Sequence, residues 1–183
     1  MAAGNAERFG ENKLAAVVNG KTLIEHALDA VPAGMLDAVC VVTQYDAVEA
    51  LALRRGFRCV RNDRPEDGLS RTVRLGTEAL QGDCDAILYL VSDQPLLRRE
   101  SVETLLRFYR AHPGHIVGAS HDGKRGNPCV FPGKYFSELC ALTGDVGGSA
   151  VIRAHTGDLL LCEIGKRELA DVDTKEALLR LKK

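Results

Sequence analysis

The residues best suited to chemistry lie at the start of the chain, in residues 2–13 (AAGNAERFGENK). Gly4 and Gly10 allow backbone conformations with positive φ and let a ligand approach the main chain closely. Consecutive N–H groups in such a turn form an anion-binding nest, and Arg8 and Lys13 add positive charge beside it. The stretch is a candidate cradle for a triphosphate, and a surface loop with two solvated cations is the alternative. Its pattern matches neither the Walker loop nor the dinucleotide-binding fingerprint.

Carboxylates at two other places are candidate metal ligands. Asp93 follows an apolar run, and Mg²⁺ prefers one or two carboxylates together with substrate phosphates. The alternative is that Asp93 caps the turn made by Pro95. Asp171 and Asp173 stand two residues apart, so their side chains would point to the same side of an extended chain. The alternative for Asp173 is the N-cap of the last helix.

Three further segments have compositions typical of binding loops. Gly68, Leu69 and Ser70 open a predicted helix, whose N-terminus is a ready anion or hydrogen-bonding site; Ser70 as a plain N-cap is the alternative. Residues 125–128 (RGNP) put a cation and an amide beside a tight backbone, and residues 144–148 (GDVGG) form a flexible loop. Both of these are equally compatible with ordinary surface turns.

Apolar runs and turn residues predict strands that alternate with helices along the chain. The predicted strands are 38–43, 57–61, 86–91, 115–120, 128–131 and 159–163, and the predicted helices are 22–31, 46–55, 70–80, 100–111, 134–142, 150–155 and 173–182. Thr22 and Glu25 have the spacing of a capping box, and Asp46 is a plausible N-cap. The alternation predicts an α/β fold with a mostly parallel sheet, in which 128–131 returns antiparallel. Ligands bind such sheets at the carboxyl ends of the strands.

Composition restricts the kind of protein. The 183 residues suit a single domain, 1–183, with a full-sized core. Lysine and arginine (24) nearly balance aspartate and glutamate (25), so no overall field attracts nucleic acid or a membrane. No apolar run approaches the ~20 residues that span a bilayer, and the first residues lack a signal-peptide core, which predicts a cytoplasmic protein. The six cysteines form no C-x-x-C pair and are interpreted as buried thiols.

The order of these motifs resembles that of MobA-like nucleotidyltransferases, most closely the molybdenum cofactor cytidylyltransferase and molybdenum hydroxylase accessory branch. That branch carries the glycine loop, a Gly-Leu/Met-Ser segment, a strand ending in Asp-x-Pro, an Arg-Gly-x-Pro segment, a Gly-Asp-x-Gly loop and a terminal Asp-x-Asp-Thr. All stand here in that order between residues 2 and 174. The resemblance implies a Rossmann-like three-layer α/β/α sandwich and transfer of CMP from CTP to molybdopterin.

The resemblance also implies roles for individual residues. Arg8 and Lys13 would act on the phosphates, and Asp93 and Asp173 would hold Mg²⁺. The residues expected to contact nucleotide or pterin are Ala2, Ala3, Gly4, Gly10, Gly68, Leu69, Ser70, Asn127 and Pro128. A molybdenum hydroxylase is the implied protein partner, with no nucleic acid and no membrane. Two alternatives are transfer to another phosphorylated acceptor, such as a sugar phosphate, and a non-catalytic carrier of finished molybdenum cofactor.

The sequence departs from the branch at three points. Ala6 replaces a serine, and Ser149 replaces an arginine that many members carry. The third departure is that only Met1 precedes the glycine loop, where the branch has an apolar first strand. The central strand therefore appears in no part of the sequence, and we expect the working polypeptide to start upstream or another segment to fill the gap.

Overall fold

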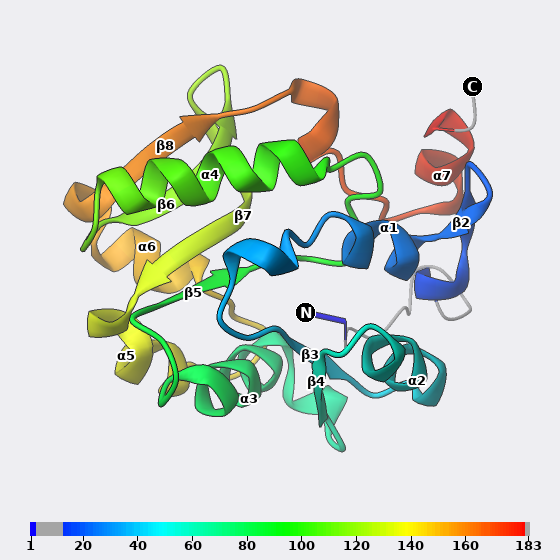
Figure 1. Ribbon diagram of the computed structural model, residues 1–183, viewed down its shortest axis with the longest axis horizontal. Helices are drawn as coiled ribbons and strands as arrows, with labels where there is room; N and C mark the ends of the chain where they lie inside the picture. Colours follow the sequence, from blue (N-terminus) through cyan, green and yellow to red (C-terminus); the bar gives the residue numbers. More distant parts are fainter. Residues whose placement is uncertain (3–12, 182–183) are drawn as a thin grey trace.

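The computed structural model describes residues 1–2 and 13–181 (Figure 1). Its strands are β1 (Val17–Val18), β2 (Lys21–Thr22), β3 (Cys40–Thr43), β4 (Arg58–Arg61), β5 (Ala86–Tyr89), β6 (Ile116–His121), β7 (Lys124–Pro132) and β8 (Leu159–Glu163). Its α-helices are α1 (Leu23–Asp29), α2 (Asp46–Arg54), α3 (Leu69–Leu80), α4 (Arg99–Ala111), α5 (Phe136–Cys140), α6 (Ser149–Ala154) and α7 (Lys175–Leu181). None of the helices in these ranges is long and apolar enough to cross a membrane.

The main sheet has the strand order β5-β7-β6-β8. Strand β7 runs antiparallel to both of its neighbours, whereas β6 and β8 are parallel. Strands β3 and β4 form a second, parallel pair. The predicted α/β architecture, mostly parallel with one antiparallel strand, is confirmed. Strand β7 is longer than predicted, and it pairs with β5 from Ala86↔Pro132 to Tyr89↔Cys129.

Alternating side chains bury both faces of the main sheet. Along β5, Ile87 and Tyr89 join the core cluster that contains residues of α3, α5 and α6. Leu88, between them, packs with the opposite cluster, where Val102 and Leu105 of α4 are fully buried. A strand alternates its side chains between the two faces of a sheet, so covering both faces produces three layers, helix, sheet and helix (Figure 1).

Local signals explain where several elements begin. Thr22 and Glu25 form the predicted capping box, in which the Glu25 N–H donates to Thr22 Oγ1 and the Thr22 N–H to Glu25 Oε2. The predicted cap at Asp46 is wrong. Tyr45, not Asp46, is the N-cap of α2, and Asp46 instead pairs with Arg61.

The alternative reading of Ser70 as a plain N-cap is excluded. The N-cap of α3 is Gly68, and Ser70 lies buried inside the first turn. The short hairpin of β1 and β2 was also not predicted. Its turn, Asn19-Gly20, has positive φ at both residues, which is the arrangement that Asn-Gly favours in two-residue hairpins.

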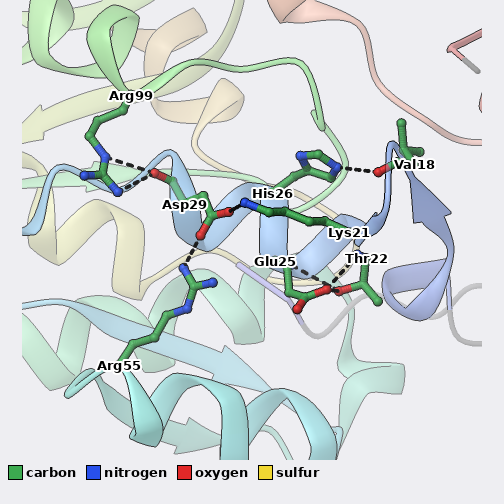
Figure 2. A network of polar contacts seen from close by, with 8 residues as sticks. All are labelled: Val18, Lys21, Thr22, Glu25, His26, Asp29, Arg55 and Arg99. Atoms are coloured by element: carbon green, nitrogen blue, oxygen red, sulfur yellow. Dashed lines mark hydrogen bonds and ion pairs between the residues drawn. The ribbon is translucent and has the colours of Figure 1, made fainter.

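Helix α1 is fastened to three neighbouring elements by the residues in Figure 2. The carboxylate of Asp29, at the end of α1, pairs with Lys21 of the hairpin at 2.6 Å and with Arg55 after α2 at 2.7 Å. The Asp29 carbonyl accepts two hydrogen bonds from Arg99 at the start of α4. Burial opposes the charge of Asp29, but Lys21 and Arg55 outweigh it and lower the pKa of Asp29.

The first two residues lie between β3 and the end of β5. Ala2 forms a parallel bridge with Thr43, and its N–H donates to the carbonyl of Val42 at 3.0 Å. The Met1 amino group donates to the carbonyl of Leu90 at 2.8 Å. Behind them, a cavity of about 160 Å³ is lined by residues of β3, β5 and α1. Within the described ranges β3 and β5 are not paired with each other, so only Met1 and Ala2 occupy the place expected for a first strand.

In a polypeptide that begins at Met1, the buried amino group of that residue generates a testable pH dependence. The residue as a whole is only partly buried, but desolvation of the amine lowers its pKa from 8.0 to about 6. Between these values the unfolded chain binds a proton that the folded chain does not, so stability should rise as pH increases from 6 to 8. The gain is at most about 3 kcal/mol. Urea unfolding across this range measures it.

The matched control is the same protein acetylated at its N-terminus. An acetylated Met1 keeps an N–H donor for Leu90 but cannot take up a proton, so this part of the pH dependence should disappear. Identical pH profiles for the free and acetylated proteins would contradict the assignment.

Candidate active site

A cleft of about 680 Å³ opens at the carboxyl ends of the strands. Its size suits a small-molecule substrate, since ligand pockets are typically about 300–1,000 Å³. Strand β5 leads into it through Ser92 and Asp93, and Tyr45 follows β3 into it. The other walls come from the start of α3, from β7 and from residues 145–149. The cleft therefore lies at the edge of the sheet where the sequence predicts ligand binding.

One ammonium group joins the two carboxylates that were predicted as metal ligands. Lys13 Nζ lies 3.0 Å from Asp93 Oδ2 and 2.9 Å from Asp173 Oδ1. The side chains of Lys13 and Asp93 are 17% and 27% exposed, whereas that of Asp173 is 62% exposed. Partial burial opposes the charge of Lys13, but its bonds to Asp173 and Asp93 outweigh this and raise the pKa of Lys13. Lys13 is therefore a cation held between two anions.

Backbone contacts bring these three residues together. Lys13 begins the 3₁₀ turn η1 (Lys13–Ala15), and Asp93 follows β5. The carbonyl of Asp93 accepts a hydrogen bond from the Val172 N–H at 2.8 Å. Val172 is fully buried among Val18, Leu23 and Leu178. This anchor places the next residue, Asp173, beside Lys13.

Asp173 is not needed to cap the last helix. Thr174 Oγ1 accepts a hydrogen bond from the Ala177 N–H at 3.1 Å, and this is the usual contact of an N-cap side chain. The carboxylate of Asp173 pairs with Lys13 instead. Thr174 therefore makes the N-cap contact that the sequence left open for Asp173, and the Asp173 side chain pairs with Lys13.

The start of α3 is bonded to the loop at 144–148. The N–H of Leu69 donates to Asp145 Oδ1 at 3.3 Å, and the N–H of Ser70 donates to the carbonyl of Gly144 at 3.2 Å. Gly68 has φ +85°, and a Cβ there would lie 2.6 Å from the backbone of Gly144. These two segments therefore form one wall of the cleft, in which the Asp145 carboxylate already occupies the N-terminus of α3.

The far side of the cleft carries an arginine and an apolar floor. Arg125 donates to Ser149 Oγ at 2.9 Å and to the carbonyl of Gly126 at 3.3 Å. Ser149, which stands where many members of the branch carry an arginine, thus accepts a hydrogen bond from Arg125. Behind them Tyr89 and Phe131 stack edge to face, with ring centroids 5.6 Å apart.

Some of the predicted site residues line the cleft, and others lie in the core or outside the described residues. Lys13, Gly68, Leu69, Asp93 and Asn127 line the cleft, and Asp173 joins it through Lys13. Ala2 lies in the core and bonds to β3, Ser70 is buried, and Pro128 stands in β7 after a cis peptide bond. Ala3, Gly4, Arg8 and Gly10 lie outside the described residues.

Sequence reasoning did not select Tyr89 and Phe131 as parts of the cleft, because aromatic residues inside apolar runs look like ordinary core. It also passed over Gln94. The neighbouring Asp-x-Pro motif marked the turn, but nothing in the sequence distinguishes this glutamine from a surface residue.

One other cluster of possible metal ligands occurs within the described ranges. His121, Asp122 and Glu163 bring their ligand atoms within 4.8 Å of one another. Glu163 already accepts hydrogen bonds from Ser120 Oγ and from the Asp122 N–H. This cluster is exposed for the most part, and it does not line the cleft.

The family model of the MobA-like NTP transferase domain matches residues 1–159. The chain belongs to this family. It is thus a nucleotidyltransferase of the MobA-like family, as its motifs indicated.

Named relatives differ in nucleotide and acceptor. The chain is 33% identical over 171 residues to a 3-phospho-D-glycerate guanylyltransferase from Phenylobacterium zucineum, covering 92% of this chain and 78% of the relative. It is 30% identical over 121 residues to an 8-amino-3,8-dideoxy-manno-octulosonate cytidylyltransferase from Shewanella amazonensis, covering 62% and 49%.

A solved structure supports the fold. Rv0371c from Mycobacterium tuberculosis aligns over 99% of this chain and 94% of its own, with a TM-score of 0.81 at 20% identity. A manganese complex of Rv0371c aligns with a TM-score of 0.77.

The close contact at Gly68 predicts an unequal pair of glycine variants. Gly56 has φ +75° with nothing within 4 Å of an added Cβ, so Gly56→Ala should cost only backbone strain, about 1–2 kcal/mol. Gly68→Ala adds a collision with the Gly144 backbone, and should cost more and displace the cleft wall. Urea unfolding measures both variants, and an equal loss of stability would show that the 68–144 contact is loose.

Proposed function

We propose that this protein transfers CMP from CTP to the terminal phosphate of molybdopterin and releases pyrophosphate. The observation that carries the proposal is the position of Lys13, held between Asp93 and Asp173 in a cleft of substrate size. Phosphoryl and nucleotidyl displacements need positioning and charge neutralisation more than covalent chemistry from the protein. An ammonium group held beside two carboxylates offers both.

The two carboxylates fit a divalent metal ion such as Mg²⁺. Asp93 Oδ2 and Asp173 Oδ1 both face the same nitrogen at about 3 Å, so they converge on one point. Carboxylate oxygens are the ligands that Mg²⁺ and Mn²⁺ prefer. When bound there, the ion would neutralise charge on the nucleotide phosphates. The manganese complex of Rv0371c supports this choice of metal class.

The cluster also explains why a triphosphate would need a cation to enter. Two carboxylates against one ammonium leave one negative charge in excess, and like charges in a partly desolvated site repel. Lys13 is drawn to the carboxylates until a cation competes for them. Its ammonium group is then close enough to the same point to contact a phosphate.

The reaction is an in-line displacement at the α-phosphorus. A phosphate oxygen of the acceptor forms the new P–O bond, and the bond between the α-phosphorus and the bridging oxygen breaks. Pyrophosphate leaves with that electron pair. Lys13 stabilises the charge that develops on the α-phosphate, and Arg8 is proposed to hold the β- and γ-phosphates with the loop amides.

Arg125 supports a phosphorylated or otherwise anionic acceptor. In the wall of the cleft, its guanidinium donates hydrogen bonds to Ser149 and Gly126. Arginine is well suited to bind phosphate. Asn127 adds an amide to the same wall. We assign this wall to binding of the pterin. A molybdenum hydroxylase would then receive the finished cofactor from this protein.

The choice of CTP rests on resemblance. Ala2, Ala3 and Gly4 match the cytidylyl branch, whereas guanylyltransferases of the superfamily usually carry Ala-Gly-Gly. The guanylyltransferase relative supports a second candidate, in which GTP is the donor and a small phosphorylated acid the acceptor. Arg125 suits either acceptor, so the donor nucleotide separates the two candidates.

A nucleotide panel tests the proposal. Calorimetry with CTP, GTP and ATP, each with and without Mg²⁺, should show tightest binding for CTP and a strong dependence on Mg²⁺. Asp93→Asn keeps the shape of the side chain but loses its charge, so it should abolish the magnesium-dependent part and leave the fold intact. Asp173→Asn should act in the same way but more weakly, because Asp173 is more exposed.

Two outcomes would count against the proposal in different ways. Tighter binding of GTP would replace CTP by the second candidate. Equal magnesium dependence in wild type and Asp93→Asn would remove the metal assignment.

Lys13 should matter for rate more than for binding. Lys13→Ala is expected to lower kcat about 10²–10³-fold, the usual effect of removing one group that stabilises transition-state charge, while nucleotide affinity changes by only a few fold. Only an interaction stronger in the transition state than in the ground state produces this split. Steady-state kinetics and calorimetry measure the two effects, and an unchanged kcat would exclude Lys13 from catalysis.

A further inference from the structure

Gln94 links the two segments that carry the carboxylates. It follows Asp93 in the turn after β5, and only 2% of its surface is exposed. Its amide nitrogen donates to Asp171 Oδ1 at 2.9 Å and approaches the carbonyl of Leu169 at 3.5 Å. Both acceptors lie in the segment that leads to Asp173.

A glutamine at position 94 lowers the stability of the fold relative to an apolar residue, so a purely structural role does not explain it. Its other amide atom, Oε1, is buried and has no hydrogen-bond partner among the described residues. A buried acceptor without a partner destabilises the fold. An apolar side chain of similar length would fill the same space without that cost, so stability alone does not account for a glutamine here.

The hydrogen bond from Gln94 to Asp171, called the link below, lies beside the ion-pair cluster. The next residue of one segment, Val172, donates its N–H to the carbonyl of the preceding residue of the other, Asp93. Asp171, before Val172, turns its carboxyl group to Gln94, and Asp173, after it, turns to Lys13. Fixing Asp171 therefore fixes the register in which Asp173 meets Lys13 and Asp93.

A second anchor holds the other end of the segment. Glu168, in η6 (Lys166–Leu169), is 4% exposed and accepts hydrogen bonds from the backbone N–H and the guanidinium of Arg98. That anchor joins the segment to the start of α4, five residues before Asp173. Gln94 is the side-chain contact nearer to the carboxylates.

We propose that Gln94 is a positioning residue that, through Asp171, holds Asp173 opposite Asp93 and so sets the spacing of the two carboxylates. This inference rests on the proposed function of those carboxylates. In it Asp171 is the acceptor of the link, since its Oδ1 accepts the hydrogen bond from the Gln94 amide.

Gln94→Met tests the proposal, because methionine has a similar length, cannot donate to Asp171, and lacks the unpaired amide oxygen of glutamine. The melting temperature should stay the same or rise. Amide hydrogen exchange at Val172 should become at least about tenfold faster, since its bond to Asp93 loses support. The affinity for Mn²⁺ in the presence of a non-hydrolysable CTP analogue should fall about tenfold, as when groups that orient metal ligands are removed.

Two variants of Asp171 serve as matched controls. Asp171→Asn keeps an oxygen that can accept from Gln94 and should retain Mn²⁺ affinity within a few fold. Asp171→Leu removes the acceptor and should reproduce Gln94→Met. The double variant Gln94→Met/Asp171→Leu should be no worse than either single variant, because both break the same link.

Two results would overturn the inference, and a third would overturn the proposed function instead. Wild-type exchange at Val172 and wild-type Mn²⁺ affinity in Gln94→Met would show that the link positions nothing. A loss in Asp171→Asn as large as in Asp171→Leu would make Asp171 a ligand. Absence of Mn²⁺-dependent nucleotide binding in the wild type would instead defeat the proposed function, while exchange at Val172 would still report on the link.

Discussion

The site depends on one ion-pair cluster built from the two ends and the middle of the chain. Lys13 is separated by 80 residues from Asp93 and by 160 from Asp173, yet all three meet within 3.0 Å contacts. Partly buried charges are tolerated only when they are paired. Removing Lys13 would leave two carboxylates facing each other, and removing one carboxylate would weaken the hold on Lys13. The cluster therefore constrains where β5, η1 and the segment before α7 can lie.

The rest of the fold can be understood as the support of this cluster. Strand β5 delivers Asp93 to the edge of the sheet, and Val172 is buried so that Asp173 follows it there. Helix α1, fastened through Asp29 to its neighbours, holds the hairpin that follows η1 (Figure 2). Between β3 and β5, the described residues that make sheet-like bonds are Met1 and Ala2.

The sequence predicted the repeating elements well and the special contacts poorly. Apolar runs located β3 and β5, because a strand buried on both faces needs them, and the run 159–162 located β8 at the edge of the sheet. The predicted cap of α2 was wrong, and the alternative of a Ser70 cap for α3 is excluded: Asp46 and Ser70 are good N-caps by type, but both lie inside the helices. Glycine at position 68 is instead required by its close approach to Gly144.

The candidate site was predictable only where a residue type announces chemistry. Asp93, Asp173 and Lys13 stood out as charges in motifs, but their mutual contacts join segments that no local pattern connects. Gln94 and Tyr89 gave no signal, because a glutamine in a turn and a tyrosine in an apolar run are ordinary. Their burial and their contacts depend on partners far away in the sequence.

The most direct test of the account is to locate the metal ion itself. Crystals grown with Mn²⁺ and a non-hydrolysable CTP analogue would show the ion by its anomalous scattering. The account predicts a peak between the carboxylates of Asp93 and Asp173, with Lys13 Nζ moved from them to the α-phosphate. A peak confined to His121, Asp122 and Glu163, or a nucleotide bound with Lys13 still between the two carboxylates, would contradict it.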